Sequence, residues 1–88
     1  MTDGDFLEAM IREALKARNG FPKPILTTMA LMEEVGELSE ALLDKEYAEV
    51  RKEAVQVAVM AMRVAVEGDA SVHDFRLSKG LDYPVGRD

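Results

Sequence analysis

The stretch from Glu46 to Glu67 constrains the fold most strongly, because it carries apolar residues at helical spacing on two sides. One stripe contains Val50, Ala54, Val57, Ala61 and Val64, and the other contains Val55, Ala58, Val59, Met62 and Val66. A helix that is apolar on two sides has to be buried on two sides. We therefore expect a long helix that ends at Gly68, with its second apolar side against another subunit. The remaining polar strip of this helix consists of Glu49, Glu53, Gln56 and Arg63.

Two further amphipathic helices are expected before the long one. From Asp3 or Asp5 to Arg18, apolar residues recur at spacings of three and four, and Asn19-Gly20 follows in the usual position of a left-handed cap. From Thr27 or Thr28 to about Leu43, a second stripe is formed by Leu31, Val35, Leu38 and Leu42. Only the short polar segment 44–46 separates this helix from the long one, which predicts an antiparallel helical hairpin.

The C-terminal part predicts one short helix. Ser71-Val72-His73-Asp74 fits the capping-box pattern with Asp in place of Glu, and Gly80 is placed to end the helix. Segments 21–24 and 81–86 contain proline and are expected to be extended. The chain thus predicts an all-α fold in a single domain over residues 1–88: a helical hairpin bundle of three main helices plus a short C-terminal helix. Because the core of so short a chain is marginal, we expect oligomerisation to complete the bundle.

The charge and composition exclude several classes of function. A net charge of −6 and an isoelectric point near 4.7 argue against binding to nucleic-acid polymers or to an anionic membrane surface. They do not exclude a phosphorylated substrate, since a bound cation would reverse the local field. No cysteine and one histidine leave no thiolate chemistry and no Ser-His-Asp or Cys-His set. The sequence shows no signal peptide and no apolar run of membrane-spanning length, so we expect a cytoplasmic protein.

Acidic residues gather on two consecutive helices. Glu33, Glu34 and Glu37 lie on the second predicted helix, and Glu53 lies on the third, followed one turn later by Gln56. Like charges three or four residues apart on a helix repel unless something neutralises them, and Mg²⁺ or Mn²⁺ prefers carboxylate oxygen. Packing the two helices along their apolar stripes brings Glu34 and Glu37 near Glu53 and Gln56. The alternative is that these residues form an ordinary solvated helix face.

The run Glu33-Glu34-Val35-Gly36-Glu37, followed after a short turn by Glu53-Ala54-Val55-Gln56, resembles the MazG-like branch of the all-α nucleoside triphosphate pyrophosphohydrolases. The resemblance covers residues 27–67. It implies that the acidic side chains hold Mg²⁺, or Mn²⁺, against a nucleoside triphosphate, which is hydrolysed between the α and β phosphorus atoms to a nucleoside monophosphate and pyrophosphate. By the same resemblance, the catalytic residues are Glu34, Glu37 and Glu53, and the metal ligands are Glu33, Glu34, Glu37, Glu53 and Gln56.

Gln56 departs from the family pattern, which has Asp at this position. A Gln carbonyl can ligate a hard cation but brings no charge, so the site would bind metal less tightly or use fewer ions. Two alternatives therefore stay open. The chain could be a degenerate relative that binds a nucleotide or a protein without catalysis, or a purely structural helical oligomerisation module. The expected partners are a nucleoside triphosphate and further copies of the chain, in a dimer or tetramer, with neither a membrane nor a nucleic-acid polymer.

Overall fold

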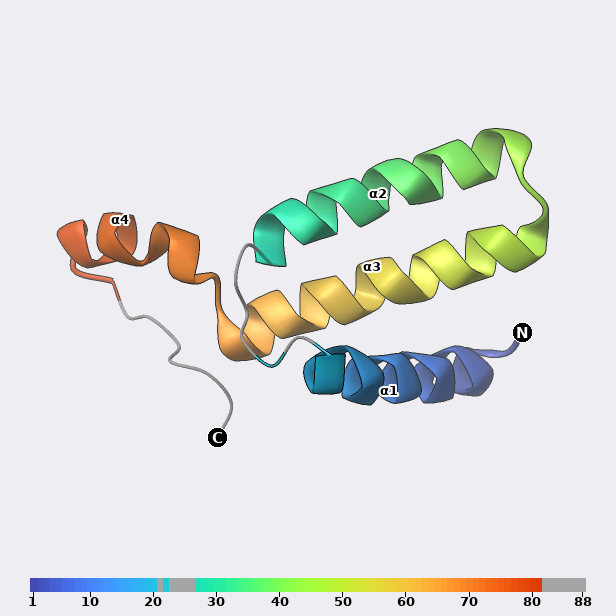
Figure 1. The fold of residues 1–88 in the computed structure, drawn as a ribbon, viewed down its shortest axis with the longest axis horizontal. Coiled ribbons are helices and arrows are strands. Elements are labelled where there is room, and N and C mark those ends of the chain that lie inside the picture. The colour runs from blue at the N-terminus through green and yellow to red at the C-terminus, as the bar shows by residue number, and fades with distance from the viewer. Residues whose placement is uncertain (21, 23–26, 82–88) are drawn as a thin grey trace.

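The computed structural model describes residues 1–20, 22 and 27–81, and all regular structure in these residues is helical. The elements are α1 (Asp3–Gly20), α2 (Thr27–Asp44), α3 (Tyr47–Glu67), a short 3-10 helix η1 (Ala70–Val72) and α4 (His73–Ser78). Helices α2 and α3 form an antiparallel hairpin, and α1 lies against the other side of α3 (Figure 1). This arrangement confirms the predicted all-α hairpin. Apart from Pro22 and Leu81, the segments expected to be extended lie outside the described residues.

The helix ends follow the sequence signals with some corrections. At the start of α1, the backbone N–H of Thr2 donates to Asp5 at 3.0 Å and the N–H of Asp5 donates to the Thr2 hydroxyl at 3.1 Å. This reciprocal pair is a capping box, which the sequence reading missed. Helix α1 also includes Gly20, which does not adopt the expected left-handed conformation. Helix α3 ends as predicted at Gly68, whose positive φ of 75° suits a residue without a Cβ.

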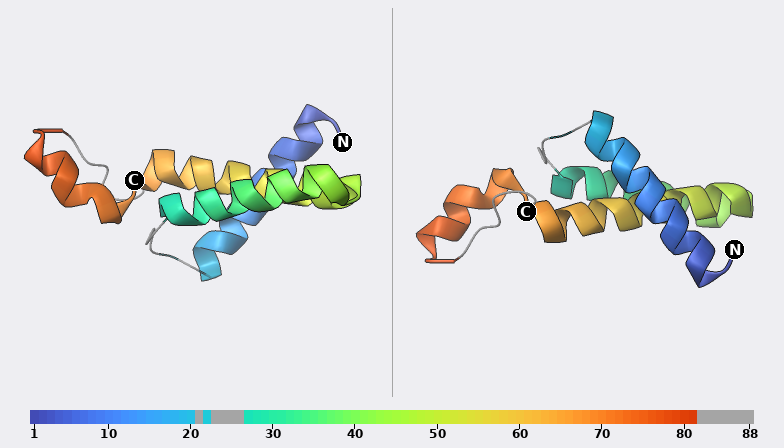
Figure 2. Two further views of the ribbon diagram at one scale, coloured as in Figure 1. Left: turned by 90° about the horizontal axis from the view of Figure 1, so that it is seen from above. Right: turned by 90° about the horizontal axis from the view of Figure 1, so that it is seen from below.

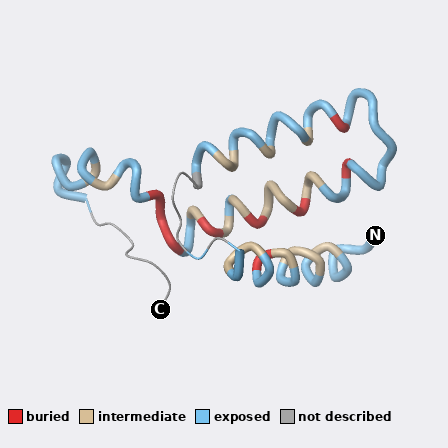
Figure 3. Tube along the Cα trace, viewed as in Figure 1, coloured by how far each residue is buried: buried red, intermediate tan, exposed pale blue. Residues whose placement is uncertain are grey.

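Helix α3 is the central element, and its buried residues account for most of the core (Figure 3). Val55 and Val59 form the core cluster with Ala14 of α1, and Phe6 and Met10 of α1 pack around them. Helix α1 of the same chain therefore covers Val55 and Val59 on the second apolar side of α3, which we expected to meet another subunit. Val66 on that side is 42 % exposed. Helices α1 and α2 thus pack on two sides of the longest helix.

Helix α2 turns a different side toward α3 than its apolar stripe predicts. Ala41 is buried and Leu38 is half-buried, but Leu42 is 60 % exposed. Ala41 brings the two backbones close together because its side chain is small, and this contact rotates the leucine stripe partly toward solvent. Glu34 lies seven residues before Ala41 and therefore on the same face of the helix. The rotation thus carries Glu34 toward α3.

A buried ion-pair cluster joins α1 to the end of α3. Glu67 accepts hydrogen bonds from Arg18 at 2.8 Å and from Arg63 at 3.0 Å. Arg63, which we placed on a polar strip, is only 4 % exposed, and Glu67 is 3 % exposed. Burial alone would raise the pKa of Glu67, but the two guanidinium groups hold that pKa below its ordinary value. Loss of one member would destabilise the fold, because it would leave a buried charge without a partner.

Asp69 holds the junction between the bundle and the C-terminal helix. Its carboxylate accepts from the backbone N–H of Thr28 at 3.1 Å and of Ser71 at 2.9 Å. The cap at this point is therefore Asp69, and the predicted capping box that begins at Ser71 is wrong, since α4 has no side-chain cap. These hydrogen bonds hold the pKa of Asp69 down to about 2. Gly80 follows α4 with a positive φ of 71°, in agreement with the prediction.

Helix α4 extends away from the three-helix bundle, as the two views in Figure 2 show. Among the described elements it packs only on η1. None of the helices in residues 1–20 and 27–81 combines the length and the apolar character that crossing a membrane requires.

Candidate metal centre

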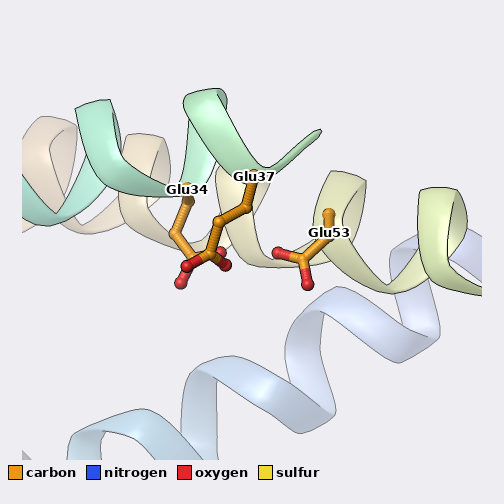
Figure 4. A group of neighbouring side chains, drawn as sticks. All are labelled: Glu34, Glu37 and Glu53. Carbon is orange, nitrogen blue, oxygen red and sulfur yellow. The ribbon is translucent and has the colours of Figure 1, made fainter. Parts of the chain in front are cut away.

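Three carboxyl groups from two helices meet on one side of the α2–α3 hairpin. Glu34 and Glu37 come from α2 and Glu53 comes from α3, and each contributes an oxygen that lies within 4.8 Å of the others. Figure 4 shows the three side chains projecting to the same side, with their carboxyl groups grouped together. The structure therefore brings together the three residues that the sequence suggested as catalytic.

The local folding of each helix explains this meeting. Glu34 and Glu37 are three residues apart, so they are neighbours on the surface of α2. Glu34 shares the buried face of α2 with Ala41, and Glu53 lies one turn after buried Val50 on α3. In the antiparallel hairpin, the side of α2 next to Ala41 faces the side of α3 next to Val50. The carboxyl groups thus meet at the edge of the helix–helix contact, where Glu34 and Glu53 are partly shielded from water and Glu37 is exposed.

Two oxygen atoms of the cluster are buried without a hydrogen-bond donor. Neither Oε2 of Glu34 nor Oε2 of Glu53 receives a hydrogen bond from the described residues. The neighbouring groups are carboxyl groups, which when ionised only accept hydrogen bonds. A buried acceptor of this kind is costly unless a proton or a cation comes between the charges. The cluster therefore favours a bound positive species.

The pKa values of two carboxyl groups in the cluster are raised. Burial, a hydrogen bond with Glu53 and repulsion from Glu37 raise the pKa of Glu34 to about 7. Such a hydrogen bond requires a protonated Glu34, because an ionised carboxylate only accepts. A hydrogen bond with Glu53, together with burial and repulsion from Glu53, also raises the pKa of Glu37. Below neutral pH the metal-free cluster can satisfy itself by holding a proton.

Glu33 differs from the other three glutamates. It is exposed and is not part of the group whose oxygens come together. Its negative charge still reaches the site, since repulsion from Glu33 contributes to the raised pKa of Glu37. Glu33 therefore lies outside the cluster and adds to the negative potential around it.

Gln56 makes a contact that the sequence did not suggest. Its side-chain nitrogen donates to Oε2 of Glu13, on α1, at 3.2 Å. The assignment of nitrogen and oxygen follows from the partner, because an ionised carboxylate only accepts. This contact places a further carboxylate, Glu13, beside the α3 residue that follows Glu53 by one turn. No motif in the sequence marks Glu13, and only the packing of α1 on α3 reveals its position.

The basic residues nearby are unequally available for an anionic ligand. Arg18 and Arg63 are engaged by buried Glu67. Lys16 lies on α1 with its ammonium 3.9 Å from Glu13, and its side chain is 78 % exposed. Lys16 therefore presents a solvent-facing ammonium group beside Glu13.

The donor set suits a hard divalent cation. Carboxylate oxygens are the ligands that Mg²⁺ and Mn²⁺ prefer. The two buried oxygens without donors fit such an ion better than they fit a solvated helix face, on which carboxylates are bonded to water. Comparisons of this chain with family models, with curated proteins and with solved structures found no match.

Proposed function

We propose that this chain is a Mg²⁺- or Mn²⁺-dependent nucleoside triphosphate pyrophosphohydrolase of the MazG-like kind. The observation that carries the proposal is the convergence of Glu34, Glu37 and Glu53, with two buried carboxylate oxygens that no donor in residues 1–20, 22 and 27–81 satisfies. The motif that resembles the family contains the same three residues. Their approach across two helices supports a common ligand.

The three glutamates of the cluster would have different roles, according to their exposure to solvent. Half-buried Glu34 and Glu53 would hold the cation from the hairpin side, and exposed Glu37 would complete the set at the solvent side, where a triphosphate can approach. A bound divalent ion would supply charge neutralisation and the activation of water for hydrolysis. Lys16 is placed to meet a phosphate oxygen from α1, where its single charge can follow a flexible ligand.

A second candidate function is favoured by Gln56. Its amide donates to Glu13 on α1 and carries no charge, so this position lacks the acid of the family pattern. A site with less negative charge could bind a metal–nucleotide complex without turning it over. In that case the chain would be a binding relative of the enzymes. The third possibility, a purely structural module, would leave the carboxylates without a ligand.

A screen of nucleoside triphosphates with Mg²⁺ or Mn²⁺, in which released pyrophosphate is measured, tests the proposal. We expect turnover of at least one triphosphate by the parent protein, and loss of turnover in Glu37→Gln and Glu53→Gln. Glu40→Gln is the matched control, because Glu40 is an exposed carboxylate on α2 outside the cluster. Binding of the nucleotide with metal but no pyrophosphate would support the second candidate. The absence of both metal binding and turnover would support the structural module.

The proposal includes assembly into a dimer or tetramer in the cytoplasm. Helix α1 covers only part of the second apolar side of α3, on which Val66 is 42 % exposed. Large apolar side chains outside α3 are also exposed and support assembly, among them Leu7, Ile11, Met29, Met32 and Leu43.

A further inference from the structure

Helix α1 carries an apolar stripe on a side that does not face α3. Leu7, Ile11 and Leu15 are spaced four residues apart and therefore lie on one face of the helix. Their exposed fractions are 55 %, 52 % and 61 %. The side of α1 that packs on the core is a different one, to which Phe6 and Met10 belong. Helix α1 thus buries one apolar side and exposes another, which we call the α1 stripe.

No other helix in the described part of the chain covers the α1 stripe. Among the described elements, α1 packs only on α3. Figure 1 shows α1 at the edge of the bundle, and the view from below in Figure 2 shows it crossing the outer side of the hairpin. Adjacent exposed apolar side chains mark interaction surfaces, whereas isolated ones are ordinary. The α1 stripe is therefore a candidate contact surface.

The exposed charges of α1 are divided between the two halves of the helix. The first half holds only acidic ones and the second half only basic ones, namely Asp3, Asp5 and Glu8, then Arg12 and Lys16. The two remaining charged residues are half-buried and have partners, Glu13 with Gln56 and Arg18 with Glu67. A helix with this order of charges is complementary to its own copy only when the two run in opposite directions.

The same charges argue against α2 of a second copy as the occupant of the α1 stripe. Met32 and Leu43 are exposed on α2, but that helix carries five acidic residues and no basic one. In either direction it would bring carboxylates against the acidic half of α1. Two copies of α2 would repel each other for the same reason, since like charges that face each other across an interface are costly. Charge therefore selects α1 of a second copy.

We propose that α1 of one copy packs antiparallel on α1 of a second copy through this stripe. A two-fold axis passes near Ile11, so Leu7 of each copy meets Leu15 of the other, and the pair closes on itself. Glu8 and Arg12 lie one position after Leu7 and Ile11 and border the stripe on one side. The axis is perpendicular to both helices and keeps that border on the same side in each copy. Glu8 of each copy therefore faces Arg12 of the other.

The contact between copies does not require the existing Glu8–Arg12 bond to break. Arg12 pairs with Glu8 of its own helix at 2.6 Å, and the two side chains are 72 % and 69 % exposed. A guanidinium has five N–H donors and a carboxylate accepts several hydrogen bonds, so two such pairs can join across the axis. Charges at the rim of an interface set orientation more than affinity, which here comes from the apolar stripe. The inference specifies the surface behind the assembly in the proposed function and does not depend on the metal centre.

Substitution of Ile11 tests the surface, because this residue lies at the two-fold axis. Ile11→Glu brings two carboxylates together there, while its exposed position leaves the bundle core unchanged. Leu43→Glu is the matched control, an equally drastic change at an exposed apolar residue of α2. Sedimentation equilibrium at micromolar concentration gives the masses, and circular dichroism confirms helical folding. We expect Leu43→Glu to keep the mass of the parent and Ile11→Glu to have half of it. A monomeric parent, or an Ile11→Glu variant with the mass of the parent, would overturn the proposal.

Cross-linking tests the direction of the two helices, since the parent contains no cysteine that could interfere. A mixture of Leu7→Cys and Leu15→Cys should form a mixed disulfide dimer under mild oxidation. Leu7→Cys alone should not, because antiparallel packing leaves its two copies eight residues, or about 12 Å, apart along the helix axis, and a disulfide needs Cα atoms within about 7 Å. Efficient cross-linking of Leu7→Cys alone, or absence of the mixed disulfide, would reject the proposal. Pyrophosphate release is measured separately, so failure of α1 pairing is distinguishable from failure of the enzymatic proposal.

Discussion

The side-chain nitrogen of Gln56 donates to Oε2 of Glu13 at 3.2 Å and so joins α3 to α1 one turn beyond Glu53. The position at which the family pattern has an acid is therefore occupied by an amide that meets a carboxylate from another helix. An acidic side chain at position 56 would face the Glu13 carboxylate with no hydrogen-bond donor between the two groups. The identities of residues 13 and 56 are thus coupled through their contact.

This coupling predicts the behaviour of Gln56→Asp. Without metal, the new carboxylate repels Glu13 and loses the hydrogen bond, which should lower stability by about 1 kcal/mol and the melting temperature by about 4–8 °C. With Mn²⁺, the added charge should tighten binding by roughly tenfold if it contributes about 1.4 kcal/mol. Differential scanning calorimetry and isothermal titration measure the two effects.

The double variant Glu13→Gln with Gln56→Asp provides the control for this prediction. It restores a donor and an acceptor with their positions exchanged, so most of the lost stability should return while the tighter Mn²⁺ binding persists. An Mn²⁺ affinity equal to that of the parent in both variants would remove Gln56 from the metal site.

Metal binding should stabilise the folded chain. A cation that binds only the folded state adds about 2.7 kcal/mol when its free concentration is 100 times the dissociation constant. Glu37→Gln and Glu53→Gln should lose this response and, without metal, melt above the parent because repulsion within the cluster is relieved. Thermal melts with and without Mg²⁺ or Mn²⁺ test this, with Glu40→Gln as the control. If neither ion changed the melting temperature of the parent protein, the result would favour the interpretation of these carboxylates as an ordinary solvated helix face.

The pH dependence of stability should show two opposing contributions. Because the folded-state pKa of Glu34 is raised from 4.5 to about 7, the stability from its protonation is fully present below pH 4.5 and is lost as the pH rises to 7. The pKa of Asp69 is lowered from 3.8 to about 2, so its contribution is present above pH 3.8 and is lost as the pH falls toward 2. The metal-free protein should therefore be most stable between about pH 4 and 5.

Glu34→Gln isolates the first of these contributions. The amide cannot ionise, so the decline between pH 4.5 and 7 should flatten. At pH 8 the variant should exceed the parent by about 1 kcal/mol, a value that allows for solvent screening of this partly exposed group. Calorimetric melts across this pH range give the measurement, and an unchanged slope in the variant would contradict the assignment to Glu34.

The buried cluster of Glu67 predicts a large structural effect. Glu67→Gln removes the charge that compensates Arg18 and Arg63, and loss of one partner from a buried pair costs about 3–5 kcal/mol. Glu8→Gln is the control, because the Glu8–Arg12 pair is exposed and contributes only about 0–1 kcal/mol. Urea denaturation of both variants measures the difference. Equal stabilities would contradict the buried ion-pair interpretation of α1 docking.

The periodicity of the apolar residues was sufficient to predict the three main helices and the hairpin. Spacings of three and four are a local property of the chain, and so are the glycine at position 68 and the short polar turn before α3. The acidic cluster was predictable for the same reason, since Glu34 and Glu37 are helical neighbours and Glu53 occupies a matching offset on the next helix. These features depend on residues close together in the sequence.

Other features were decided by the packing of distant segments. The composition of α1 does not indicate that it would cover the second side of α3, or that Glu13 would meet Gln56. The burial of Arg63 and Glu67 depends on Arg18, which comes from α1. The link between the start of α2 and the residue after α3 depends on Asp69, which accepts from the N–H of Thr28. A charged or polar residue on a helix can be solvated or buried with a partner, and the one-dimensional pattern is the same in both cases. The sequence by itself determined the helices and the acidic motif, whereas only the tertiary structure decided which polar groups are paired, because pairing depends on distances between helices.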